Sequence, residues 1–316
     1  IAAFLLTIFN GSAEIAVFDV IKILFNPSAP EASLAEGRII WDFRLPRALA
    51  ATLAGASLSL SGLLLQSIFR NPLAGPFVLG ISSGASLGVA LFLLAGFGLG
   101  SLGLLSAAAL GAMAVLAFIA LFSKFISSNA GLLVLGLMIG YFADAVVSIL
   151  MHSTNTAALR GFISWGFGSF GRLRWEELPY FAICILLGII LSVFCIKYLN
   201  AIALGEDSAK SLGINVKQKQ LLSLLAAAVL AAAATSFCGP IGFIGMATPH
   251  LARGFFNSDN QRVLIPASLL SGALLALVAG LLSQGLWGMP SLPLNAVASL
   301  MGAPVVIWVL LPKKHR

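Results

Sequence analysis

Charged side chains are scarce in this sequence: Asp, Glu, Lys and Arg together make up 9% of its 316 residues. A soluble domain carries about 25%. Hydrophobic residues make up 59%, and the mean hydropathy is +1.04, which leaves too few polar side chains to cover a globule in water. The composition therefore excludes an ordinary soluble domain and places the chain in a lipid bilayer.

Cysteines are few, and the residue patterns of common enzymes are missing. The three cysteines, Cys184, Cys195 and Cys238, lie at irregular spacing in apolar segments and form no CxxC pair or Cys/His cluster. We therefore interpret them as core thiols rather than metal ligands. Neither an HExxH zinc pattern nor a GxxxxGK[ST] phosphate-binding loop occurs. We expect no catalytic residue, metal site or cofactor in this chain, so that any ATP hydrolysis must occur in another polypeptide.

Long apolar runs are abundant, and they lack the alternating pattern of a β-barrel. We expect them to form α-helices that cross about 30 Å of hydrocarbon. Ten such helices are predicted at Ile1–Phe9, Arg47–Phe69, Phe77–Gly96, Leu102–Phe122, Leu132–His152, Leu178–Lys197, Leu221–Cys238, Gly242–Phe256, Val263–Leu282 and Leu294–Leu311. The first spans nine residues, and we expect it to be the remainder of a longer helix.

Basic residues in the loops indicate the orientation. Ten crossings place both termini on one side, and the side richer in Lys and Arg faces the cytoplasm. The side of the C terminus holds eleven of them: Arg70, Lys124, Lys197, Lys210, Lys217, Lys219, Arg253, Arg262, Lys313, Lys314 and Arg316. The other side holds seven: Lys22, Arg38, Arg44, Arg47, Arg160, Arg172 and Arg174. This bias predicts cytoplasmic termini, and the net charge of +7 requires no nucleic-acid partner.

Small residues recur at helical spacing. Ala51, Gly55 and Ser59 lie four residues apart on one face of a predicted helix, and Gly84 and Gly88 repeat the spacing in the next. In a membrane such a face lets two helices approach closely, where dispersion replaces the hydrophobic effect. The pattern predicts a compact helix bundle.

A carboxylate lies in the middle of one apolar segment. Asp144, in GYFADAVVSIL, would cost about 2.5 to 3.5 kcal/mol if ionised at the bilayer centre. Its side chain must therefore face protein, water or a partner. Two interpretations stay open: a carboxylate that lines or gates a pathway, and a hydrogen bond between helices.

The stretch GPIGFIGMATPHLAR, from Gly239 to Arg253, interrupts the apolar pattern. Pro240 and Pro249 each remove a backbone donor and the glycines permit tight turns, so we expect a chain reversal followed by a short returning helix. Broken helices at membrane depth often border a cavity or gate, although a structural kink is the alternative. His250 is either a ligand or switch, or a side chain bonded to carbonyls that the prolines have freed.

Two features outside the apolar runs are candidates for partner contacts. LGEDSAKSLGINV, residues 204–216, predicts a two-turn helix with an apolar stripe, which is either a solvated turn or a knob that fits a cytoplasmic partner. On the other side of the membrane, Arg44 and Arg47 of RLPR lie on one face at the start of a helix. Cations oppose the dipole there, so an acidic partner would explain them; snorkelling to lipid headgroups is the alternative.

Four motifs in order carry a family resemblance: RLPRALAATLAGASLSLSGLLLQSIFRNPLAGPFVLGISSGA, LGEDSAKSLG, GPIGFIGMATPHLAR and LPLNAVASLMGAPVVIW. The chain resembles the membrane permeases of ABC importers for ferric siderophores, haem and vitamin B12, the type II importers. The resemblance covers residues 44–311 and says nothing of cargo.

The resemblance implies an all-α polytopic membrane protein of about ten helices, with residues 1–316 as one transmembrane permease domain. Family permeases form homodimers in the inner membrane, with the pathway on the dimer axis. They bind two cytoplasmic ATPase subunits, which hold ATP and Mg, and one periplasmic substrate-binding protein. The expected cargo is a ferric siderophore, haem or cobalamin, with molybdate or tungstate in some relatives. The alternative function is an ion-coupled secondary transporter that uses Asp144 as its carrier site.

The resemblance also implies residue roles. The coupling segment 204–216 would contact the ATPase through Gly205, Glu206, Ala209, Leu212 and Gly213. Docking of the binding protein, next to the periplasmic segment 153–177, would use Arg44 and Arg47, while Gln284 lies near the place of a further docking arginine. The cytoplasmic gate would comprise Asn71, Leu73, Asn129 and Ala130, of which the last two differ in type from the vitamin B12 permease. The pathway candidates are Asp144, Trp165 and Phe167.

Overall fold

The computed structural model describes residues 1–11, 13, 15–25, 35–96, 100–123, 125–126, 128–285 and 290–310. All regular structure in these ranges is helical, which confirms the predicted all-α class. The first half contains α1 (Ala2–Phe9), α2 (Val17–Phe25), α3 (Ala35–Arg38), the π-helical η2 (Ile39–Arg44), α4 (Leu45–Phe69), the 3-10 turn η3 (Pro76–Leu79), α5 (Ile81–Leu94), α6 (Gly100–Phe122) and α7 (Asn129–His152). The second half contains α8 (Thr156–Gly166), the 3-10 turn η4 (Phe170–Arg172), α9 (Leu178–Val193), α10 (Ile196–Ala203), α11 (Glu206–Ser211), α12 (Val216–Cys238), α13 (Ile244–Phe256), α14 (Gln261–Ser283) and α15 (Leu294–Leu310).

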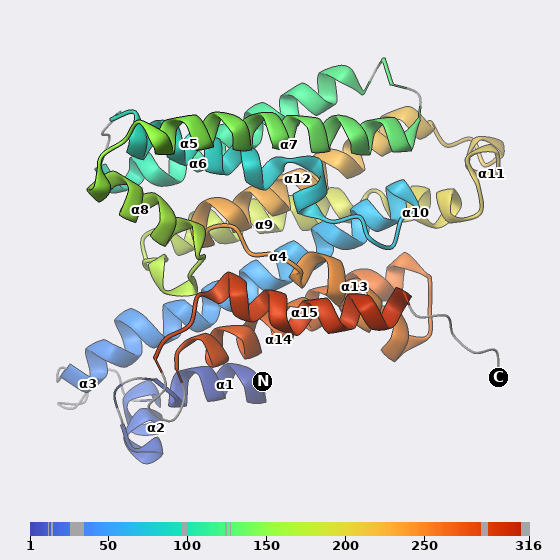
Figure 1. The fold of residues 1–316 in the computed structure, drawn as a ribbon. Coiled ribbons are helices and arrows are strands. Elements are labelled where there is room, and N and C mark those ends of the chain that lie inside the picture. The colour runs from blue at the N-terminus through green and yellow to red at the C-terminus, as the bar shows by residue number, and fades with distance from the viewer. Residues whose placement is uncertain are drawn as a thin grey trace.

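Long apolar helices run side by side through the molecule (Figure 1). Five described segments are long and apolar enough to cross a membrane: Ala35–Phe69, Gly103–Phe122, Ala130–His152, Val216–Cys238 and Gln261–Ser283. The pair α9 and α10 would form a sixth crossing, bent by 52°, while α5 and the Leu294–Ile307 part of α15 are shorter apolar helices. The two remaining predicted crossings coincide with the short helices α1 and α13.

Two predicted crossings differ most from the helices that form. The crossing predicted to start at Arg47 starts at Ala35, because α3 and η2 continue without a break into α4. The crossing predicted as one helix to Lys197 bends after Val193 and continues as α10.

The central helix is α4, which packs on α12, α13 and α14. Its small residues permit this contact: a Cβ added at Gly55 would lie 2.2 Å from the Gly272 carbonyl oxygen, and one at Gly62 would lie 1.6 Å from that of Gly245. Ala51 and Ser59 are buried on the same helix. Gly84 and Gly88 of α5 meet α6 in the same way, so the predicted small-residue packing is confirmed.

Serine hydroxyls join α4 to α12 within the core. Ser57 donates a hydrogen bond to the Leu230 carbonyl and Ser61 donates one to the Ala227 carbonyl, both at 2.7 Å. Where no water is available, polar side chains between helices must find such partners. The bonds fix the register of α4 against α12.

The bundle has two ends, which we name by their short helices. At the α8 end lie α2, α3 and α8, and at the α11 end lie α10 and α11 (Figure 1). The start of α7 also lies at the α11 end, and α15 runs towards it. These two ends carry the candidate docking, coupling and gate residues.

Candidate functional site

The α11 segment is an exposed helical projection. It is a six-residue helix that begins after Gly205 and is followed by Gly213, both with positive φ, of 128° and 73°. This confirms the predicted short helix and its end. The expected single apolar stripe is wrong: Leu204 and Leu212 are 77% and 67% exposed, whereas Ala209 is buried against the bundle. The two leucines instead flank the projection.

Charge on α11 is arranged to suit its dipole. Glu206 lies in the first turn and pairs with Lys210 in the last turn at 2.9 Å. The carboxylate is stabilised by the positive end of the helix dipole, and the ammonium group by the negative end. The hydrogen bond to the Glu206 carboxylate, together with its charge, raises the pKa of Lys210. More than half of each side chain stays exposed, at 58% for Glu206 and 57% for Lys210, so the pair is accessible to a partner protein.

The gate candidates lie at the same end. Asn71 and Leu73 are in the turn after α4, where the Asn71 side chain accepts a hydrogen bond from the Leu73 amide at 2.9 Å. Ala130 is exposed in the first turn of α7; the placement of the Asn129 side chain lies outside the described residues. The turn and the start of α7 therefore share the α11 end of the bundle (Figure 1).

The two arginines of RLPR have different environments. Arg44 is 5% exposed, and its guanidinium donates to the carbonyls of Ile8, Phe9 and Ala13 at 2.8, 2.9 and 2.5 Å. It joins the end of α1 and the residues after it to η2. Arg47 is half-buried, and in the part of the chain that the structure describes no hydrogen bond or ion pair engages its guanidinium. Arg47 is therefore the arginine of this pair that is available to a ligand.

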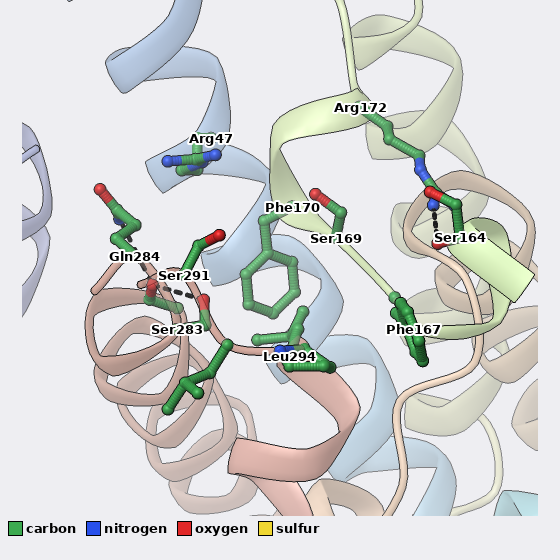
Figure 2. Close-up of a pocket in the computed structure, with 14 residues that line it drawn as sticks. Arg47, Ser164, Phe167, Ser169, Phe170, Arg172, Ser283, Gln284, Ser291 and Leu294 are labelled. Carbon is green, nitrogen blue, oxygen red and sulfur yellow. Dashed lines mark hydrogen bonds between the residues drawn. The ribbon is translucent and has the colours of Figure 1, made fainter. Parts of the chain in front are cut away.

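Arg47 lines a cavity of about 620 Å³ at the α8 end. In Figure 2, Arg47 and Gln284 lie on one side of the Phe170 ring, and Arg172 and Ser164 lie on the other. Hydroxyls of several serines complete a polar wall, and none of the described residues that line the cavity carries a carboxylate. A second hollow of about 230 Å³ shares Arg47 and Gln284 with the first. The cavity is positively charged and suits an acidic group.

Arg172 was not among the predicted site residues. Its guanidinium donates to the carbonyls of Ser164 and Trp165, which end α8, and burial lowers the pKa of Arg172. The two carbonyls occupy part of the hydrogen-bonding capacity of the guanidinium. Arg172 therefore has two roles: it holds the cavity wall in place and it adds positive charge to the cavity. No motif or spacing indicates this role, because the cavity forms only when η4 folds back beside α8.

The pathway candidates do not come together. Asp144 is exposed on α7, where its carboxylate accepts a hydrogen bond from Ser83 of α5 at 3.4 Å. Trp165 is buried at the end of α8, while Phe167 is 49% exposed in the wall of the cavity. The Ser83 contact is of the kind expected for a bond between helices, and the exposed carboxylate leaves the pathway interpretation open.

The broken segment after α12 takes the predicted form. The chain reverses through Gly239 and Phe243, both with positive φ, and returns as α13. The last residue of α12 contacts the cavity wall, because the Ser169 amide donates to the Cys238 carbonyl at 2.7 Å, and Ser169 lines the cavity. The interruption thus begins beside the wall of the cavity, although residues 239–253 do not line the cavity itself.

His250 of α13 bonds to a carbonyl, as one of the two interpretations predicted. Its Nε2 lies 2.7 Å from the Pro72 carbonyl oxygen, in the turn after α4. The expectation that the carbonyl would be one freed by the neighbouring prolines was wrong, because the partner belongs to another segment.

The bundle, with its crossing helices, broken segment and exposed α11, defines an integral membrane permease subunit. The profile of the FecCD transport family matches residues 1–312. A hemin transport system permease protein, HmuU of Yersinia pestis, is 36% identical over 97% of this chain and 92% of its own. The vitamin B12 import system permease BtuC of Vibrio cholerae is 36% identical over 92% of this chain and 87% of its own.

A solved structure shows the same arrangement. An inward-facing structure of a transporter described as metal-chelate type ABC superposes with a TM-score of 0.85 at 30% identity, over 98% of this chain and 96% of that one. The chain belongs to the FecCD transport family, and the resemblance in the sequence motifs is confirmed.

Proposed function

We propose that this chain is the transmembrane permease subunit of a binding-protein-dependent ABC importer. It works as a homodimer and moves a ligand of the metal-chelate type, a ferric siderophore, haem or cobalamin, into the cytoplasm. ATP hydrolysis in two partner subunits drives the transport. The observation that carries the proposal is the exposed α11 projection on a bundle that matches the FecCD transport family over residues 1–312.

The α11 end is the cytoplasmic end in this proposal, with both termini in the cytoplasm of a cell with an inner membrane. The ATPase binds α11, so that Leu204 and Leu212 supply apolar contact and Glu206 supplies charge. Ala209 is buried and fixes the projection to the bundle, while Gly205 and Gly213 set its direction. A short rigid element of this kind can transmit a displacement without deforming.

Transport follows from alternating access along the axis between two copies. When ATP brings the ATPase subunits together, the α11 segments move with them, and α7, with the Trp165–Phe170 segment, changes which side of the axis is open. Shape and weak contacts hold the cargo, because tight binding would oppose its release. Asn71, Leu73, Asn129 and Ala130 close the cytoplasmic side.

The α8 end is the docking face for the periplasmic binding protein. Arg47, whose guanidinium has no hydrogen-bond or ion-pair partner within the described ranges, receives an acidic side chain of that protein beside the polar cavity. Arg44 acts indirectly, since its three carbonyl bonds hold the residues after α1 beside the same face. Gln284 lines the cavity as a neutral hydrogen-bonding group.

An Arg47→Glu variant is expected to weaken docking of the binding protein by at least about 30-fold, because loss of one partner of a buried charge pair costs roughly 2 to 5 kcal/mol. The measurement is the affinity of the binding protein for the permease held in lipid nanodiscs. Arg160→Glu, an exposed charge change on α8 outside the cavity, is the matched control and should change affinity little. Equal effects of the two variants would remove Arg47 from the interface.

Assembly with an ATPase is tested by measuring ATP hydrolysis. The permease purified with its ATPase in nanodiscs should show ATP hydrolysis that the binding protein stimulates, and failure to bind an ATPase would contradict the proposal.

The cargo class is read from the melting temperature of the binding protein with haemin, cyanocobalamin, a ferric siderophore or molybdate. A shift with one of the first three supports metal-chelate cargo, whereas a shift with molybdate alone would assign an oxyanion instead.

A further inference from the structure

The turn that follows α4 is fixed by its own hydrogen bonds. Arg70 adopts a left-handed conformation with φ of 47°, which directs the chain out of the helix. The Asn71 side-chain oxygen accepts a hydrogen bond from the Leu73 amide at 2.9 Å, and the Asn71 backbone carbonyl accepts one from the Ala74 amide at 3.1 Å. We call residues 70–74 the α4 turn. These bonds make it a compact unit, so its position depends on the contacts that hold it from outside.

The Arg70 side chain links the α4 turn to the start of α11. Its guanidinium donates to the carbonyl of Ile202 in α10. The same carbonyl accepts a hydrogen bond from the Gly205 amide at 3.1 Å. Gly205 immediately precedes α11, and its φ of 128° is one that other residues rarely adopt. One carbonyl therefore joins a cation of the α4 turn to the residue that sets the direction of α11.

His250 links the same turn to α13. Its Nε2 lies 2.7 Å from the Pro72 carbonyl oxygen, and the residue is 9% exposed. A carbonyl can only accept, so Nε2 carries the proton. A neighbouring contact reinforces this side: the Gln66 amide donates to the Met246 carbonyl at 3.0 Å and accepts from Arg253 at 2.8 Å. The end of α4 and its turn are thus bonded to α13 through several side chains.

We propose that Arg70 and His250 are positioning residues of the transport cycle. Arg70 makes the α4 turn follow α11, and His250 makes it follow α13, so that a displacement of α11 by the ATPase reaches Asn71 and Leu73. This inference rests on the proposed function, which assigns α11 to the ATPase contact and the turn to the gate.

The two links act from different elements, which explains why both are needed. A turn bonded to α10 alone would follow α11 but could slip along α13, and a turn bonded to α13 alone would not follow α11. Arg70 suits the first link, because a guanidinium bonded to a carbonyl is a charge-assisted contact, stronger than a neutral one. His250 suits the second, because a buried ring has few alternative positions.

The first test needs only the purified chain in nanodiscs. Arg70→Met and His250→Phe remove the donors and keep the bulk of the side chains, whereas Arg70→Lys and His250→Gln keep a donor. Hydrogen exchange at the amides of residues 73 and 74 should become about ten-fold faster in the first pair, as expected for the loss of one partly buried hydrogen bond. The second pair should restore most of the protection. Arg262→Met, which removes an exposed cation from the start of α14, is the control.

The second test uses the permease with its ATPase and binding protein in liposomes and haemin as the probe. Arg70→Met and His250→Phe should lower the amount of haemin imported per ATP hydrolysed by about ten-fold, in the range of ordinary coupling between sites. ATP hydrolysis itself should stay within about two-fold of the unaltered protein, because the ATPase contact on α11 is intact. Arg70→Lys and His250→Gln should recover the ratio.

The outcomes separate this inference from the proposed function. Unchanged exchange in the turn, or uptake and hydrolysis that fall in parallel, would overturn the positioning role of these residues. Faster exchange together with a lower ratio supports it. If Glu206→Arg leaves uptake normal while exchange in the turn still responds to Arg70→Met, the assignment of α11 to the ATPase is wrong, and the coupling role of Arg70 is overturned with it.

Discussion

A Glu206→Arg variant is expected to hydrolyse ATP while importing less than about a tenth of the normal amount of cargo. Glu206 is 58% exposed in the first turn of α11 and pairs with Lys210 at 2.9 Å. Arginine at this position would place a cation at the positive end of the helix and beside Lys210, and both interactions are repulsive. The contact with the ATPase would lose its charge complementarity. The measurement is uptake and phosphate release in the same liposomes.

Two controls isolate the contact with the partner. Lys210→Gln removes the intrahelical pair but leaves the Glu206 carboxylate, and an exposed pair of this type contributes little to stability. Asp207→Asn removes a neighbouring charge that is fully exposed. Both variants should keep most of the uptake. Normal uptake by Glu206→Arg itself would show that α11 does not transmit the motion of the ATPase.

Gly62→Ala is expected to abolish folding. The added Cβ would lie 1.6 Å from the carbonyl oxygen and 2.5 Å from the carbonyl carbon of Gly245. These are backbone atoms of the opposing segment, so no side chain can rotate away, and α4 would have to separate from α13. Overpacking in a core typically costs about 1 to 3 kcal/mol where side chains can adjust, and more is expected here. The measurement is the yield of monodisperse protein in detergent and its melting temperature.

Gly254→Ala in α13 is the matched control, because a Cβ there would meet no atom within 4 Å. Alanine is the better helix former, and such changes at permitted positions stabilise proteins by about 0.4 to 1 kcal/mol. This variant should therefore melt at the same temperature as the unaltered protein or slightly above it. A Gly62→Ala protein with normal yield and melting temperature would show that α4 and α13 do not pack this closely.

Features set by local chemistry were predictable from the sequence. The small residues at Ala51, Gly55 and Ser59 identified a packed face, because in lipid only close approach stabilises a helix pair. Gly213 marked the end of a short helix, and Gly239 with Pro240 marked a reversal, because each restricts or extends the backbone conformations available. These signals involve neighbouring residues, so they need no knowledge of the fold.

Features set by tertiary contacts were not predictable. In the sequence, Arg44 and Arg47 look alike, because both lie on one face at the start of a helix. In the structure, Arg44 donates hydrogen bonds to carbonyls 31 to 36 residues earlier in the chain. Only the folded chain shows that, among the described residues, Arg47 lacks such partners. The 52° bend between α9 and α10 occurs in SVFCIK, which has neither proline nor glycine. The links from Arg70 to Ile202 and from His250 to Pro72 join residues 132 and 178 positions apart, beyond the reach of any spacing rule.

The central claim is that this chain is a conduit driven through α11 by another polypeptide. The most direct measurement is accumulation of the ligand identified with the binding protein inside liposomes, against its concentration gradient. The permease with ATPase, binding protein and ATP should accumulate it, and removal of any one of the three should abolish accumulation even when a proton or sodium gradient is imposed. Accumulation by the chain alone under such an ion gradient, lost in Asp144→Asn, would contradict the claim and assign an ion-coupled transporter instead.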